Sequence, residues 1–173
     1  MAAAALAGGC FADEFELRNK LGDGMTALVY VAVRRSTGEN FACKLCDRRH
    51  SKGAWSRLSE LMRHENELLG RIGPHPSLVS HRGYYENTLQ CALLLDLVQG
   101  GDCQQLLQRQ GALPESSVQS MITELHSALS HLHSLCILHR DVKLENLLCD
   151  TSVRPPAVKL CDLGHATNCN LVE

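Results

Sequence analysis

The stretch that decides the fold of this chain is Leu138-His139-Arg140-Asp141-Val142-Lys143-Leu144-Glu145-Asn146-Leu147-Leu148. Within it, the carboxylate of Asp141 could accept a proton, and the side-chain oxygen of Asn146 is a hard ligand suited to Mg²⁺. A second stretch, Lys159-Leu160-Cys161-Asp162-Leu163-Gly164, is an apolar strand that ends in an Asp before a Gly. Asp162 supplies another hard oxygen ligand. Together these side chains predict a site for proton transfer and metal binding.

Two features nearer the N-terminus suit phosphate binding. The glycines of Leu21-Gly22-Asp23-Gly24 would let backbone N–H groups approach phosphates closely, although a plain tight hairpin is the simpler interpretation of this segment alone. The segment is no Rossmann or Walker-type fingerprint, because a strand follows it and the chain has no Gly-Lys-Ser/Thr. Lys44 lies in an apolar strand, where its ammonium needs a carboxylate or a phosphate. Glu65, on the apolar face of the next helix, is the candidate partner; the alternative is an edge-strand lysine that reaches solvent.

Hydrophobic periodicity predicts a first part with five strands and one helix, and then a mostly helical second part. The pair Gly100-Gly101 marks a hinge-like break between the two parts. The expected strands are 15–21, 29–33, 41–46, 78–79 and 90–98, and the expected helices are 58–72, 102–110 and 114–133.

The composition is that of a globular protein in a reducing compartment. The 173 residues are 45% hydrophobic and 21% charged, and the formal net charge of −2 gives no reason to expect nucleic acid as a partner. No stretch is long and apolar enough to span a membrane, and residues 1–12 lack the basic start of a secretory signal. The nine cysteines are odd in number and scattered, which indicates free thiols and an intracellular location, in the cytoplasm or the nucleus. A zinc site at Cys43 and Cys46 is disfavoured, because residues three apart on a strand point to opposite faces.

Taken in order along the chain, four motifs are present: the glycine-rich segment, Lys44, the stretch around Asp141 and the stretch that ends in Asp162-Leu163-Gly164. Together they resemble the signature set of eukaryotic protein kinases over roughly Phe15 to Gly164. Lys143, two residues after Asp141, is the form typical of serine/threonine kinases, and its surroundings are similar to the calcium/calmodulin-dependent and AMP-activated kinase group. The resemblance implies an α+β, protein-kinase-like fold, with a five-stranded antiparallel N-lobe, one main helix and an incomplete helical C-lobe. The expected divisions are a disordered N-terminal tail over 1–12, the N-lobe over 13–98 and a partial C-lobe over 99–173.

The resemblance also implies ATP and Mg²⁺ as cofactors and a protein substrate or regulatory partner. Lys44, paired with Glu65, would hold the α- and β-phosphates. Asp141 would orient and deprotonate the substrate hydroxyl, and Lys143 would steady the γ-phosphate. The implied Mg²⁺ ligands are Asn146 and Asp162.

Further residues are implied to contact the nucleotide. The glycine-rich segment would cover the phosphates, Val29 and Ala42 would enclose adenine above Leu148, and Leu95 would be the gatekeeper. The implied ATP-contacting residues are Leu21, Gly22, Asp23, Gly24, Met25, Thr26, Ala27, Leu28, Val29, Ala42, Lys44, Leu95, Asp96, Val98, Asp102, Glu145 and Leu148.

The sequence departs from the family pattern at several positions. Ala27 replaces the third glycine, Leu163 replaces the Phe of Asp-Phe-Gly, and His81 stands where an apolar residue normally stacks. The chain ends at Glu173, so we expect a truncated domain that stops within the activation segment. The principal hypothesis is an ATP-dependent protein serine/threonine kinase. The alternatives are a catalytically inactive kinase-like protein that binds or regulates other proteins, and a chain that does not fold stably alone.

Overall fold

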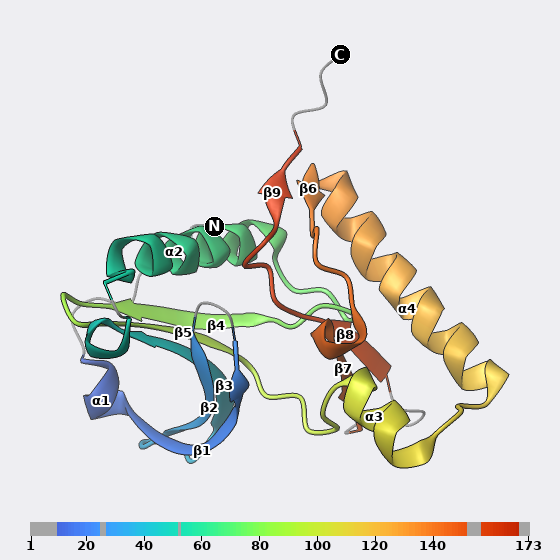
Figure 1. Cartoon of the computed structure of the whole chain (residues 1–173), viewed down its shortest axis with the longest axis horizontal. Coiled ribbons are helices and arrows are strands. Elements are labelled where there is room, and N and C mark those ends of the chain that lie inside the picture. Colours follow the sequence, from blue (N-terminus) through green and yellow to red (C-terminus); the bar gives the residue numbers. More distant parts are fainter. Residues whose placement is uncertain (1–9, 25–26, 52, 152–156, 170–173) are drawn as a thin grey trace. The chain divides into compact units, whose positions relative to one another are not determined.

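Figure 1 presents the computed structural model of the chain, which describes residues 10–24, 27–51, 53–151 and 157–169. These residues divide into two compact units. Unit 1 holds the described residues of 1–73 and 80–97, and unit 2 holds those of 74–79 and 98–173. The boundary after Leu97 lies one residue before the one expected from the sequence. Residues 74–79, expected in the first lobe, belong to unit 2.

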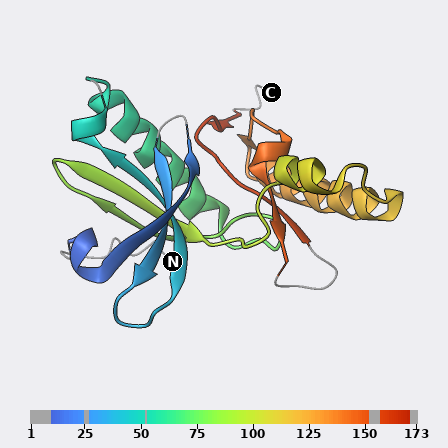
Figure 2. The ribbon, with the colours of Figure 1, turned by 60° about the horizontal axis from the view of Figure 1, so that its bottom comes forward.

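Unit 1 is built on a five-stranded antiparallel sheet with the strand order β1-β2-β3-β5-β4. The predicted sheet and its main helix are confirmed, and Figure 2 shows the twist of the strands and the helix that lies along them. The elements of unit 1 are α1 (Phe11–Glu14), β1 (Phe15–Asp23), β2 (Leu28–Arg34), β3 (Asn40–Asp47), the 3₁₀ turn η1 (Arg48–His50), α2 (Trp55–Ile72), β4 (His81–Glu86) and β5 (Gln90–Asp96).

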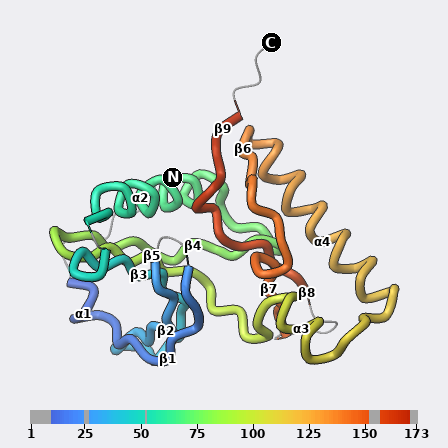
Figure 3. Tube along the Cα trace, in the orientation of Figure 1, coloured from blue at the N-terminus to red at the C-terminus, as the bar shows by residue number. Residues whose placement is uncertain are grey.

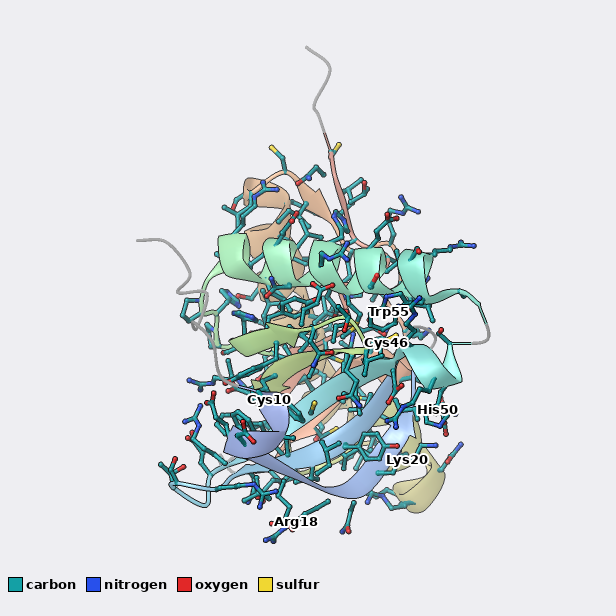
Figure 4. The ribbon with its side chains drawn as sticks, turned by 90° about the vertical axis from the view of Figure 1, so that its left-hand side faces the viewer. Cys10, Arg18, Lys20, Cys46, His50 and Trp55 are labelled. Carbon is teal, nitrogen blue, oxygen red and sulfur yellow. The ribbon has the colours of Figure 1, made fainter. Side chains whose placement is uncertain are left out.

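Helix α2 forms because apolar residues recur at three- and four-residue spacing, and this face contacts β3, β4 and β5. Met62 and Leu68 are almost fully buried on it, and so is Glu65. In Figure 4, Trp55 at the start of α2 and Cys46 near the end of β3 lie at the same end of unit 1. Helix α2 therefore places the carboxylate of Glu65 in the apolar layer beside the sheet.

The other face of β3 packs into an aromatic cluster, because alternate residues of a strand point to opposite sides. The rings of Phe15, Phe41 and Tyr85 meet there with centroids less than 6 Å apart. Phe11 stacks on Phe15 at 5.3 Å and begins α1. Residues 11 and 12 of the tail expected over 1–12 belong to α1, and the Phe11 ring is buried; residues 1–9 lie outside the described residues.

Unit 2 combines two helices with short antiparallel ladders, which Figure 3 traces along the chain. Helix α4 contacts β8 and β6, and its buried residues Ala128 and Leu132 meet a core that includes Ile137 and Val158. The ladders pair β6 with β9 and β7 with β8. The elements of unit 2 are α3 (Cys103–Gln110), α4 (Glu115–Ser134), β6 (Ile137–Leu138), the 3₁₀ turn η2 (Leu144–Asn146), β7 (Leu147–Asp150), β8 (Ala157–Leu160) and β9 (Thr167–Asn168).

The strand expected at Leu78-Val79 is wrong. The fourth strand of the sheet is β4, and Leu78 instead forms an isolated parallel bridge with Leu160 of β8. The N–H of Val79 donates to the Leu160 carbonyl at 3.0 Å, and the N–H of Leu160 donates to the Ser77 carbonyl at 2.9 Å. The apolar pair is buried in unit 2, because β8 offers it both backbone partners and apolar side chains.

Helix α4 does not bury all of its apolar side chains. Val118 is 42% exposed and Ile122 is 58% exposed, whereas Leu132 is fully buried. With 20 residues, α4 exceeds every other described helix in length. None of the described helices combines the length and the apolar character that a membrane span needs.

Candidate active site

The carboxylate of Asp141 is the centre of a hydrogen-bonded cluster in unit 2. Lys143 Nζ lies 2.8 Å from Asp141 Oδ2, and Asn146 Nδ2 donates to the same oxygen at 2.9 Å. The η2 turn brings Asn146 back toward Asp141, because the Asn146 N–H donates to the Lys143 carbonyl at 3.0 Å. The hydrogen bond from Lys143, reinforced by Asn146, holds the pKa of Asp141 below its ordinary value against the opposing effect of burial. Asp141 is thus kept as a charged acceptor.

The loop that carries Asp141 is anchored by His139, which is 2% exposed. His139 Nδ1 accepts the N–H of Asp141 at 3.3 Å, so its Nε2 carries the proton and donates to the Cys161 carbonyl at 2.9 Å. The N–H of Cys161 in turn donates to the Asn146 carbonyl at 2.9 Å. These hydrogen bonds join the loop that carries Asp141 to the segment that ends in Asp162.

Asp162 and Asn146 present a donor set that fits Mg²⁺, since a carboxylate and an amide both offer hard oxygen ligands. Asp162 has φ +63°, and Arg140 in the loop has φ +66°. Such left-handed conformations of residues other than glycine are strained and gather at functional sites. Asp162 Oδ1 also accepts the N–H of Gly164 at 3.2 Å. Among the described residues, at this site or at any other, His, Cys, Asp and Glu side chains form no group of three that could hold a metal ion.

In unit 1, the structure brings Lys44 and Glu65 together as a buried ion pair. Lys44 Nζ lies 2.5 Å from Glu65 Oε1, and the two side chains are 11% and 2% exposed. Lys44 is on β3, which pairs with β2 on one side and β5 on the other. The alternative of an edge-strand lysine is therefore wrong. The partner proposed from the sequence is the one that the structure gives.

The glycine-rich segment connects β1 to β2. Gly22 is paired with Val29 across the two strands, and the N–H of Gly24 donates to the Ala27 carbonyl at 2.9 Å. A Cβ on Gly24 would lie 2.8 Å from that carbonyl oxygen, so this close approach requires glycine. Strands β1 and β2 thus pair as an antiparallel hairpin on either side of this segment. Met25 and Thr26 lie outside the described residues, while Leu21, Asp23 and Leu28 lie on β1 and β2.

The residues expected around adenine are distributed over both units. In unit 1, Ala42 and Leu95 are cross-strand partners, and the N–H of Asp96 donates to the Ser80 carbonyl at 3.0 Å. In unit 2, Asp102 and Leu148 form an isolated antiparallel bridge. Asp102 Oδ1 also caps α3 by accepting the N–H of Gln105 at 2.7 Å. Val98 and Glu145 lie in unit 2 as well, and the Glu145 side chain is exposed on the η2 turn.

One residue near Asp141 has no counterpart among the expected site residues. His165 Nδ1 lies 3.7 Å from Asp141 Oδ2. The sequence places His165 three residues after Asp162, which signals proximity to the metal motif. Nothing in the sequence aims the ring at Asp141, because that contact depends on how the segment folds back.

Comparison with known proteins agrees with this geometry. Residues 15–172 match the family model described as "Protein kinase domain". The chain is 34% identical to the serine/threonine-protein kinase DCLK2 of Rattus norvegicus over 90% of this chain and 20% of the relative. It is 30% identical to calcium-dependent protein kinase 10 of Oryza sativa subsp. japonica over 88% and 25%, and 30% identical to the liver/testis phosphorylase b kinase gamma catalytic chain of Bos taurus over 89% and 38%.

The chain thus spans between a fifth and two fifths of the length of these curated relatives. The calcium-dependent kinase among them agrees with the group resemblance noted in the sequence. The family model covers nearly the whole chain, and the matched range includes the Asp141 cluster and the Lys44–Glu65 pair. This chain belongs to the protein kinase family.

Proposed function

We propose that this chain binds Mg-ATP and transfers the γ-phosphoryl group to serine or threonine hydroxyls of a protein substrate. The observation that carries the proposal is the Asp141 carboxylate, held by Lys143 at 2.8 Å and by Asn146 at 2.9 Å. Membership of the kinase family supports the reaction type, and relatives named as serine/threonine kinases support the choice of acceptor.

Phosphoryl transfer depends mainly on positioning and on neutralising charge, because the transferred group needs little covalent help from the protein. Asp141 would orient the acceptor hydroxyl and promote its deprotonation. Lys143, whose ammonium lies beside Asp141, would steady the γ-phosphate. Mg²⁺, held by Asn146 and Asp162, would neutralise charge on the phosphates.

The residues of unit 1 would bind the nucleotide. The ion pair with Glu65 fixes the ammonium of Lys44, which would hold the α- and β-phosphates. Backbone N–H groups of the segment around Gly22 and Gly24 would cover the phosphates. The proposed adenine and ribose contacts of unit 1 are Val29, Ala42, Leu95 and Asp96, and the family resemblance adds Val98, Asp102 and Leu148 of unit 2.

Transfer of radiolabelled phosphate from ATP to a mixed serine/threonine peptide library tests the proposal. We expect Asp141→Ala to abolish transfer while retaining an ATP-dependent rise in melting temperature, because a ligand of the folded state still stabilises it. Glu115→Gln, an exposed change at the start of α4, is the matched control and should leave transfer unchanged. Transfer that survives Asp141→Ala would point to a contaminating kinase.

A second candidate function is that of an inactive kinase-like protein that binds or regulates other proteins. The observation that favours it is the exposure of Val118 and Ile122 on α4, since exposed apolar side chains in a patch mark interaction surfaces. ATP-dependent stabilisation without any phosphate transfer by the wild-type chain would favour this function.

We place either function inside the cell, in the cytoplasm or the nucleus. No disulfide bond joins cysteines of the described chain, and five cysteines are buried. Unpaired buried thiols are typical of proteins in reducing compartments. The net charge of −2 gives no support for a nucleic-acid partner, so the proposed partners are proteins.

A further inference from the structure

Two buried thiols of unit 2 lie against each other. The Sγ atom of Cys103, the first residue of α3, is 3.6 Å from the Sγ atom of Cys149 on β7. Cys103 is fully buried, and Cys149 is 5% exposed. A disulfide bond is about 2 Å long, so the two sulfur atoms need to approach by less than 2 Å to form one. Neither sulfur takes part in the proposed phosphoryl transfer.

The backbone on both sides holds the two thiols in place. The N–H of Gly100 donates to the Cys149 carbonyl at 2.9 Å, and the N–H of Cys149 donates to the Gly101 carbonyl at 2.8 Å. Asp102 and Leu148, the residues just before the two cysteines, form the isolated antiparallel bridge. The fold therefore fixes the contact between the sulfur atoms, although the two cysteines are 46 positions apart in the sequence.

Burial decides how this pair can react. Loss of solvent, with a smaller effect of the neighbouring Cys149, raises the pKa of the Cys103 thiol to about 12. Cys103 therefore carries little thiolate near neutral pH, and the thiolate is the reactive form. The small exposed area of the pair belongs to Cys149, so Cys149 is the residue that an oxidant meets first. Access depends on local opening of unit 2, so the reaction is slower than at the exposed Cys136.

We propose that Cys103 and Cys149 form an oxidative modification site, in which hydrogen peroxide converts the two thiols into a disulfide that joins α3 to β7. The Cys149 thiolate attacks one peroxide oxygen, the O–O bond breaks, and the departing hydroxide takes up a proton to become water. The Cys103 sulfur then attacks the Cys149 sulfenic acid. The S–O bond breaks, and the departing hydroxide takes the Cys103 proton. The two thiols together lose two electrons, and the peroxide is reduced to two water molecules.

The disulfide would also act on nucleotide binding, and this part of the inference rests on the proposed function. Asp102 and Leu148, which flank the pair, are both proposed contacts of ATP. A Cβ on Gly100 would lie 2.1 Å from the Cys149 carbonyl oxygen, so the paired backbones have no room to come closer. Closure of the disulfide therefore draws the first turn of α3 toward β7. Asp102 caps that turn, so its carboxylate moves with it. We expect weaker binding of Mg-ATP as the result.

Peptide mapping of the full chain tests the site without any nucleotide. After treatment with hydrogen peroxide, remaining thiols are blocked with N-ethylmaleimide, and the chain is digested with trypsin in the absence of reductant. The linked peptides have the summed mass less two hydrogen atoms, and fragmentation distinguishes Cys103 from Cys91, which shares its tryptic peptide. We expect the Cys103–Cys149 link to be present once the exposed Cys136 is fully oxidised. Recovery of both residues as alkylated thiols at that point, or a link from either one to another cysteine, would overturn the proposal.

Two controls distinguish positioning by the fold from chance pairing. In urea the preference for the Cys103–Cys149 link should disappear, because an unfolded chain brings its nine cysteines together without selection. An equal preference in urea and in buffer would overturn the argument from the structure. Cys136→Ser should retain the link, whereas Cys149→Ala should abolish it and leave Cys103 alkylated. The wild-type map decides the question even if Cys149→Ala does not fold.

Calorimetric titration with Mg-ATP measures the effect on binding. We expect the Kd of the oxidised chain to rise about 3- to 10-fold, the change that loss of one hydrogen bond produces. Dithiothreitol should restore the original Kd, and peroxide treatment of Cys149→Ala should leave it unchanged. An unchanged Kd in the oxidised wild-type chain would overturn the effect on nucleotide binding. A reduced chain that does not bind ATP would overturn the proposed function, and the peptide map would still decide whether the disulfide forms.

Discussion

Replacing Lys44 by methionine should destabilise unit 1 far more than a surface charge change would. Lys44 Nζ lies 2.5 Å from Glu65 Oε1, and at an effective dielectric constant of about 20 this separation corresponds to about 7 kcal/mol of attraction. Desolvation of the two charges offsets much of that attraction when the pair is intact. Lys44→Met deprives the 2%-exposed Glu65 side chain of this ion-pair partner, and such one-sided losses cost about 3–5 kcal/mol.

The chain offers a matched control for burial. Lys20 and Asp23 form an ion pair at the same 2.5 Å, but their side chains are 43% and 72% exposed. Lys20→Met should therefore cost less than about 1 kcal/mol. Adding Glu65→Leu to Lys44→Met should recover at least half of the lost stability, since apolar replacement of both partners of a buried pair is often neutral.

Urea denaturation followed by tryptophan fluorescence measures these differences in unit 1. The sequence has one tryptophan, Trp55, at the start of α2, ten residues before Glu65. A Lys44→Met cost of less than 1 kcal/mol, or equal costs for Lys44→Met and Lys20→Met, would refute the argument that burial makes this pair strong. A double variant less stable than Lys44→Met would refute the explanation by lost charge compensation.

Three further predictions concern unit 2 and are checked by denaturation followed by circular dichroism. Gly100→Ala should lower the free energy of unfolding by about 1–3 kcal/mol or more, because the new Cβ would lie 2.1 Å from the Cys149 carbonyl oxygen. A variant as stable as the wild type would show that this close approach is absent. Leu132→Ala should cost about 2–5 kcal/mol, whereas Ile122→Ala, at a position 58% exposed, should cost less than about 1 kcal/mol; equal costs would contradict the assignment of the buried face. Burial lowers the pKa of His75 below its ordinary 6.5, so the unfolded chain takes up this proton at a higher pH than the folded chain does. The free energy of unfolding should therefore fall as the pH drops below 6.5. The same decline in the His75→Asn variant would show that another group causes it.

Much of the fold followed from the sequence because its signals are local. The alternation of apolar residues and the turn at Thr37-Gly38 predicted the strands that pair as β2 and β3, and helical spacing predicted α2. The Lys44–Glu65 pair was predictable for a related reason: each charge lies on an otherwise apolar face, where it requires a partner. Neither signal required knowledge of distant contacts.

Other features were decided by tertiary structure, because periodicity reveals which residues are buried and not what they are buried against. Leu78 and Val79 are apolar as predicted, yet their partner is β8 rather than the sheet. Phe11 has a defined position because its ring packs against the rings of Phe15 and Tyr85.

The sequence by itself determined the family and the sheet with its helix, and it supplied the residues that we propose carry the chemistry, since these depend on side-chain types at fixed spacings. Only the tertiary structure placed β3 in the middle of its sheet and brought His165 to the carboxylate of Asp141. That contact joins a loop to a segment more than twenty positions away along the chain. It depends on the hydrogen bond between the Cys161 N–H and the Asn146 carbonyl and on the left-handed conformation of Asp162. The spacing of residues along the chain does not predict this contact, because a segment of the same length can follow many other backbone paths that do not bring its end near Asp141.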